Sequence, residues 1–204
     1  VGSEMCIRDS KTYNKDYLWI YSYITPFYDA EYRRFHNMVH INSGLNVLSN
    51  LNLSITDEQY IAWLFHDIIY FPGYDKNEEM SAQYMSDFCK THNLDINIDL
   101  AYQIIMDTKQ HKPTCEESKI VLDMDMYTLG QPSYKYFRTD RINVIFEYER
   151  FCGGTNKAEA GVLDFLKNIQ GQKIFCTDDF QQFQSCFEHN TQEYIKSVSY
   201  THLT

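Results

Sequence analysis

The chain has 204 residues, of which 44% are hydrophobic and 23% are charged, a composition typical of a globular protein and not of a disordered one. A formal net charge of −10 argues against a broad surface for duplex nucleic acid or for an anionic membrane. No apolar run predicts a transmembrane span, no signal peptide is recognisable, and the six cysteines form no Cys-x-x-Cys pair, so we expect a cytoplasmic protein with reduced thiols.

Helical periodicity of apolar residues runs through almost the whole chain, and strand-like alternation never persists. The first helix is predicted over residues 13–24, before the Thr25-Pro26 breaker, and the second over residues 29–50. A capping box at Thr56 predicts the start of a third helix, which ends near Tyr70. Further helices are predicted over 78–92 with Asn77 as N-cap, 99–111, 116–129 closed by Gly130, 134–151 ended by Gly153-Gly154, 157–169 and 179–196. The predicted fold class is therefore all-α.

Residues 11–196 are enough to bury one hydrophobic core, so we predict a single domain. Residues 1–10 (VGSEMCIRDS) and 197–204 (SVSYTHLT) lack helical periodicity and resemble translated adapter sequence. We expect both ends to be non-native, and Cys6 and His202, which lie in them, are not considered as site residues.

The pair His66-Asp67 lies in the middle of an apolar run, where burying two ionisable groups costs free energy unless a partner satisfies them. His40 belongs to a second predicted helix, and Asp123 and Asp125 belong to another one with an apolar sequence. Separate helices that offer imidazole and carboxylate groups can build one octahedral metal centre. Two imidazoles and two carboxylates suit Mn, Fe, Co, Ni or Zn better than Mg, which prefers oxygen. Asp123 and Asp125 point to different faces of a helix, and the pattern alone does not choose between them.

Five phrases follow one another along the chain: Arg34-Phe35-His36-Asn37-x-x-His40-Ile41, Trp63-Leu64-Phe65-His66-Asp67-x-x-Tyr70, Asn77-Glu78-x-x-Ser81-Ala82, Ile105-x-x-Thr108-x-x-His111 and Leu122-Asp123-x-Asp125-x-x-x-Leu129-Gly130. In this order they resemble the HD-domain superfamily of metal-dependent phosphohydrolases, and in particular a bacterial subgroup of predicted HD phosphohydrolases. The likeness runs from about residue 17 to residue 195.

The resemblance implies a single HD-domain helical bundle over residues 11–196, with a metal site between helices. It implies that the metal ligands are His40, His66, Asp67 and Asp125. Asp125 is preferred over Asp123 because the second acid of the family's Asp-x-Asp phrase usually binds. One divalent ion is expected, with Mn, Fe, Co, Ni, Zn or Mg as candidates, and a second ion is compatible with the same resemblance.

Other residues of these phrases have implied roles. The Phe-His-Asn-x-x-His phrase is also similar to that of cyclic-nucleotide phosphodiesterases, which implies that His36 is a general acid, and a neutral-range pKa suits a histidine to that role. Asn37 could bond the substrate or cap a network. Glu78 could act as a base toward metal-bound water, or it could be a first-turn acid favoured by the helix dipole. His111, near Lys109, could bind phosphate or a second metal, or it could sit as a cation at a helix C-terminus.

The function implied by the resemblance is that of a metal-dependent phosphohydrolase acting on a nucleotide or another small phosphate ester or anhydride. A hydroxide on the metal would attack phosphorus. Four cations are best placed by sequence to meet phosphate, although solvation at the surface is the ordinary fate of any one: Arg34, Lys109, Arg138 and Arg141. One alternative is a non-catalytic nucleotide- or metal-binding regulator. The other is a di-iron oxygenase on the HD fold, which would need His111 and Glu78 as extra ligands.

Overall fold

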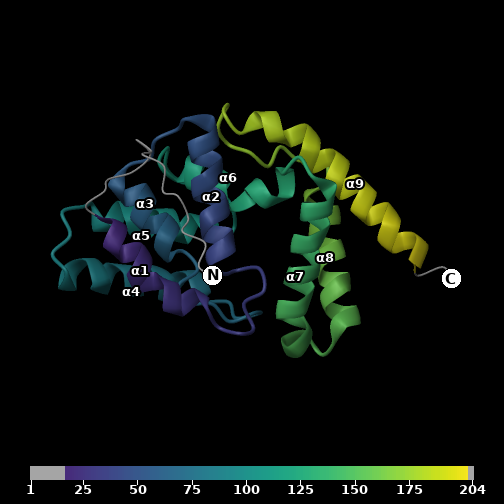
Figure 1. The fold of residues 1–204 in the computed structure, drawn as a ribbon, viewed down its shortest axis with the longest axis horizontal. Helices are drawn as coiled ribbons and strands as arrows, with labels where there is room; N and C mark the ends of the chain where they lie inside the picture. The colour runs from purple at the N-terminus through teal and green to yellow at the C-terminus, as the bar shows by residue number, and fades with distance from the viewer. Residues whose placement is uncertain (1–16, 202–204) are drawn as a thin grey trace, which may run out of the picture.

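The computed structural model describes residues 17–201, with the side chains of residues 17–198. Within this range the chain is helical and has no strand, which confirms the all-α prediction (Figure 1). In chain order the elements are α1 (Leu18–Tyr28), α2 (Met38–Leu51), α3 (Asp57–Phe65), α4 (Asn77–Thr91), α5 (Ile98–Thr108), α6 (Ser118–Gly130), α7 (Tyr134–Cys152), α8 (Thr155–Ile169), the 3-10 turn η2 (Gln181–Phe183) and α9 (Gln184–Thr201). Among these helices, none combines the length and the apolar character that a membrane crossing requires.

The helices form two groups joined by α6. Helices α1 to α6 pack around α3, which is buried on all sides from Gln59 to Phe65. A helix that is apolar all round belongs at the centre of a core. Helices α7 and α8 form an antiparallel hairpin beside this group, and α9 runs along its outer edge (Figure 1). The cavity described below lies between the central group and the α7–α8 hairpin.

Helix α3 starts where the capping box predicts and ends earlier than expected. Thr56 and Gln59 exchange the two side-chain hydrogen bonds of a capping box. The helix then ends at Phe65, so the prediction that it continues to about residue 70 and contains His66-Asp67 is wrong. The Arg33 guanidinium donates to the backbone carbonyls of Asp67 and Ile68, which replaces the hydrogen bonds that a longer helix would supply.

The long helix predicted over residues 29–50 is also wrong in its first part. Residues 29–37 form turns, and α2 starts at Met38 with Asn37 as its N-cap, whose side chain accepts from Val39 N. Asparagine is a strong cap and a weak residue in a helix interior, which explains the break. His36 is therefore held on a loop and does not lie one helical turn before His40.

Three other predicted helix ends differ from those in the structure. Helix α1 passes through Pro26 and ends at Tyr28, whose buried hydroxyl donates to Leu64 O, so tertiary packing overrides the breaker. Asn77 is the first residue of α4 and not its N-cap; its side chain exchanges two hydrogen bonds with the backbone of Phe71. Helix α5 ends at Thr108, which leaves residues 109–111 outside it.

The C-terminal predictions divide in a similar way. Gly153 caps α7 in the left-handed conformation, as expected. Gly130 is the last residue of α6 and not its cap, and a Cβ there would lie 2.7 Å from the Phe175 ring, so close packing requires glycine. Helix α9 continues past the predicted end at 196 to Thr201, with Val198 buried. The non-native origin of the two ends stays a prediction, since residues 1–10 and 202–204 lie outside the described range.

Candidate metal centre and active-site cavity

Four predicted ligands converge from three parts of the central helical group. His40 lies in the first turn of α2, His66-Asp67 follows α3 directly, and Asp125 lies on α6. One ligand atom each of His40, His66 and Asp67 lies within 4.8 Å of the others, so this group could hold a metal ion. The Oδ1 atom of Asp125 lies 3.1 Å from His40 Nε2 and 3.8 Å from His66 Nε2, which places a fourth donor beside the group.

The two acids that sequence alone could not separate have different environments. Asp123 is fully buried, and its carboxylate accepts hydrogen bonds from Cys176 N at 2.6 Å, Thr177 N at 2.8 Å and the Thr177 hydroxyl. These bonds attach the segment before α9 to α6. Asp125 faces the histidines instead. In this structure Asp123 has a structural role, and Asp125 is the acid of the candidate metal centre.

The arrangement of the donor atoms calls for a cation. His66 Nδ1 lies 2.8 Å from Trp63 O, and because a carbonyl can only accept, Nδ1 carries the hydrogen and Nε2 is left with its lone pair in the neutral ring. That Nε2 lies 3.1 Å from Asp67 Oδ2 and 3.3 Å from His40 Nε2. Acceptors this close repel one another unless a proton or a metal ion lies among them. The donor set of imidazole nitrogens and carboxylate oxygens fits a divalent ion.

The pKa values of these groups are shifted in the directions that favour positive charge in the site. Burial alone lowers the pKa of His66, but the neighbouring carboxylates of Asp67 and Asp125 outweigh it and raise the pKa to about 9. Burial raises the pKa of Asp67, but the imidazoles of His66 and His36 outweigh burial, and the net pKa lies well below its usual range. The pocket therefore stabilises a cation among these side chains.

An aromatic support holds the His66 ring in place. The Trp63 indole stacks on His66 with ring centroids 4.6 Å apart and an angle of 16° between the planes. Its Nε1 donates to Ile41 O at 3.0 Å, which connects α3 to α2. A Cβ at Gly44 would lie 2.3 Å from the Trp63 ring, so this glycine in the interior of α2 permits the close approach.

His36 is oriented by a carboxylate from the opposite side of the cavity. Its Nδ1 lies 2.6 Å from Oε2 of Glu147 on α7, and Oε1 of Glu147 accepts from the backbone N–H groups of Phe35 and His36. The Tyr70 hydroxyl donates to the same carboxylate, and its ring stacks on His36 with centroids 4.2 Å apart. Burial lowers the pKa of His36, but Glu147 and then Asp67 raise it more, and the net pKa is raised.

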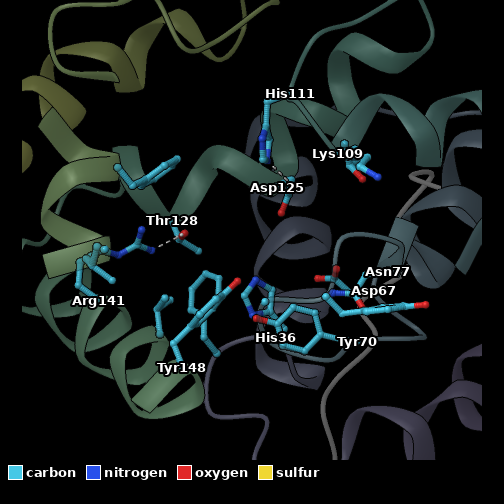
Figure 2. Close-up of a pocket in the computed structure, with 18 of the residues that line it drawn as sticks. His36, Asp67, Tyr70, Asn77, Lys109, His111, Asp125, Thr128, Arg141 and Tyr148 are labelled. Atoms are coloured by element: carbon cyan, nitrogen blue, oxygen red, sulfur yellow. Dashed lines mark hydrogen bonds and ion pairs between the residues drawn. The ribbon is translucent and has the colours of Figure 1, made fainter. Parts of the chain in front are cut away.

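A cavity of about 500 Å³ opens on this group (Figure 2). It is lined by most of the residues for which the sequence implied a role: His36, His66, Asp67, Glu78, Lys109, His111 and Asp125. Burial is the main cause of a raised pKa at Glu78. Asn37 does not line the cavity, because its side chain caps α2 and donates to Arg33 O and Arg34 O.

Lys109 and His111, the two candidate phosphate-binding residues after α5, are both paired with acids. Lys109 donates to the carboxylate of Glu79 and to Asp75 O. His111 has a positive φ of 50°, and its Nε2 lies 2.9 Å from Asp125 Oδ2. Burial lowers the pKa of His111, but Asp125 outweighs it and the net pKa is raised. His111 thus contacts a candidate ligand directly and does not act as a cation at a helix end.

The opposite wall of the cavity comes from the α7–α8 hairpin and was largely missed by sequence reasoning. It includes apolar and aromatic side chains: Val144, Tyr148, Ala158, Val162 and Phe165. It also contains Arg141, which the sequence named only among several candidate cations. Glu147 was not predicted at all. The available signal was an acid in an aromatic-rich helix, and nothing local indicated that it would meet residues 35 and 36.

Comparison of the chain with protein-family models, with curated proteins and with solved structures found no match in any of the three.

Proposed function

We propose that this chain is a metal-dependent phosphohydrolase built on a single HD-type domain, with a nucleotide or another small phosphate ester or anhydride as substrate. The observation that carries the proposal is the convergence of His40, His66, Asp67 and Asp125 beside a cavity of about 500 Å³ that His36 also lines. The resemblance of the sequence phrases to HD phosphohydrolases supports the same function. In this chain, the phrases between residues 36 and 125 contain both the four candidate metal donors and the candidate general acid.

The four donors would hold one divalent ion, with Mn, Fe, Co, Ni and Zn matching the mixed nitrogen and oxygen set better than Mg. Such an ion, when bound, supplies Lewis-acid activation of water and neutralises charge on a phosphoryl oxygen. The chain's own groups orient these donors: Trp63 O fixes the tautomer of His66, and Arg33 holds the backbone carbonyl of Asp67.

His36 is the proposed general acid. Its Nδ1 donates to Glu147, so the proton on Nε2 is free to be given to the leaving oxygen of the substrate. The raised pKa favours the protonated ring, which is the form that a general acid requires. The stacked Tyr70 ring and the Glu147 carboxylate together restrict the ring to one orientation.

Glu78 is the proposed base, since it is half-buried, lines the cavity and has a pKa raised toward the range in which it can exchange a proton with water. His111 stabilises Asp125 through their 2.9 Å contact and is the first candidate for holding a second ion. Lys109 faces the cavity with part of its charge compensated by Glu79, so its contribution to phosphate binding is smaller than its position in the sequence indicates.

A hydrolysis screen tests the proposal. Purified protein would be incubated with nucleoside mono-, di- and triphosphates and with generic phosphate esters, with and without a chelator. We expect phosphate release from at least one class of substrate that stops on chelation and returns when a divalent ion is added. Tight nucleotide binding without phosphate release would point to the regulator instead. Two irons per chain without hydrolysis would point to the di-iron oxygenase.

A further inference from the structure

Arg141 is a buried cation that forms no ion pair with an acid among residues 17–198. It lies on α7, its side chain lines the cavity opposite Asp67 and Tyr70, and the residue is 5% exposed (Figure 2). Its Nε atom is buried without a hydrogen-bond partner among the described residues. Its one hydrogen bond in that range is a long one, 3.4 Å, from Nη2 to the Thr128 hydroxyl.

The neighbours of Arg141 compensate its charge only in part. The guanidinium lies over the rings of Phe35 and Phe137, at 5.3 Å and 5.4 Å from their centroids. The adjacent acid, Asp140, accepts a hydrogen bond from Gln131 and forms no ion pair with Arg141, so its charge raises the pKa of Arg141 only from a distance. Burial lowers the pKa of Arg141 to about 10, at which the group is still charged at neutral pH. A buried charge left in this state favours an anion from outside the chain.

The position of Thr128 connects this cation to the candidate metal centre. Thr128 and Asp125 are three residues apart on α6, so they share one face of the helix about one turn apart. The Phe35 ring beneath Arg141 is also next to the rings of His36 and His40, with centroids 4.8 Å and 5.2 Å away. An anion at Arg141 would therefore share the cavity with whatever the metal centre holds.

We propose that Arg141 and Thr128 form an oxyanion-binding subsite in the α7 side of the cavity, which takes a phosphate or carboxylate group of the ligand. The planar fork of the guanidinium matches two oxygens of such a group, and the Thr128 hydroxyl supplies another donor. The apolar side chains around it, among them Val144 and Leu129, strengthen the contact by excluding water. Where the ligand is the substrate, the inference rests on the proposed function. The subsite then favours substrates that carry an anionic group in addition to the one at the metal centre.

Anion binding to the metal-stripped full-length chain tests the subsite without any need for turnover. The probes are inorganic phosphate and acetate. Binding of both is measured by the shift in melting temperature, and binding of phosphate is also measured by 31P NMR titration. We expect phosphate to stabilise the wild-type chain, and Arg141→Gln to weaken this binding about tenfold or more, as for loss of a charged hydrogen-bond partner. Thr128→Val should weaken it less. Stabilisation by phosphate alone would identify a phosphate subsite, and stabilisation by acetate as well would identify a general oxyanion subsite.

The matched control is Arg138→Gln, which removes the same charge from an exposed position one turn earlier on α7. Arg138, named by sequence as a candidate cation, does not line the cavity, so its substitution should leave phosphate binding unchanged. Thr128→Val keeps the shape and the arginine, so it reports on the subsite even if Arg141→Gln folds poorly. Equal phosphate binding by wild type, Arg141→Gln and Thr128→Val would overturn the inference, and so would the absence of any phosphate effect on the wild type. Because no metal and no catalysis are involved, these results are independent of whether the hydrolase proposal holds.

Discussion

The two walls of the cavity present different charged groups to a ligand. The wall made by α2, the turn after α3 and α6 gathers imidazoles and the carboxylates of Asp67 and Asp125, so it favours a cation. The wall made by α7 offers the buried guanidinium of Arg141, which forms no ion pair among residues 17–198, so an anion is favoured there. A phosphate ester needs both kinds of contact. The candidate donors of the first wall could be predicted from the sequence phrases. The second wall exists only because α7 packs against the loop before α2.

The largest effect should come from breaking the cation-binding wall. Asp67→Asn keeps the shape of the side chain and removes one charged donor, so metal binding and hydrolysis should be lost together, with activity falling by about 10³-fold or more. Metal content of the purified variant and its rate of phosphate release are the measurements. Asp164→Asn, at an exposed position on α8, is the control and should change neither. Wild-type activity in Asp67→Asn would remove Asp67 from the mechanism.

His36 lies where the two walls meet, and its loss should separate chemistry from metal binding. His36→Ala should keep the full metal content, because His36 is not a donor of the group, and should lower kcat by about 10²-fold to 10³-fold through loss of the general acid. Substrates with a good leaving group, such as nitrophenyl esters, should be affected least. A variant that loses its metal would show that His36 supports the metal centre and does not act as an acid.

Glu147 acts on His36 from the α7 wall, and its effect should appear in the pH profile. His36 as an acid works while it is protonated, and Glu147 raises its pKa, so the carboxylate extends activity to higher pH. Glu147→Gln removes that contribution while burial still lowers the pKa. The alkaline limb of the kcat profile should therefore move to lower pH, with a loss of about tenfold at neutral pH. An unchanged alkaline limb would mean that another group sets it.

The smallest effect on activity should come from Asp123, two residues from Asp125 on the same helix. Asp123→Asn weakens the hydrogen bonds to Cys176 and Thr177 and should lower the free energy of unfolding by about 1–3 kcal/mol, with metal content unchanged. Denaturant unfolding and metal analysis measure the two quantities. Asp125→Asn is the matched comparison and should show the reverse pattern, with metal lost and stability less affected. If Asp123→Asn loses metal as well, the assignment of the two acids needs revision.

Much of the fold follows from local patterns, because the signals that set it are local. Apolar periodicity identified the helices, the capping box at Thr56 set the start of α3, and Gly153 set the end of α7. The candidate ligands were predicted from the cost of burying polar residues in apolar runs, together with the resemblance of five sequence phrases to HD phosphohydrolases. The structure brings His40, His66 and Asp67 together, as that reasoning predicted.

The two largest failures are caused by contacts between distant parts of the chain. Residues 29–37 have helical periodicity, yet Glu147 takes the N–H groups of residues 35 and 36, more than 100 residues away in sequence, and Asn37 caps the helix that follows. The end of α3 is set by Arg33 in the same way. No local pattern in α7 distinguishes Glu147 or Arg141 from other charged residues, so their roles required the tertiary structure.

The most direct test of the central claim measures metal content and hydrolysis on the same preparation. Wild-type protein would be stripped by a chelator and titrated with Mn, Fe, Co, Ni, Zn and Mg, while bound metal per chain and phosphate release are recorded together. The account predicts that activity rises in proportion to occupancy and saturates at one ion per chain, or at two if His111 holds a second. Phosphate release that persists after the metal is fully removed would contradict it.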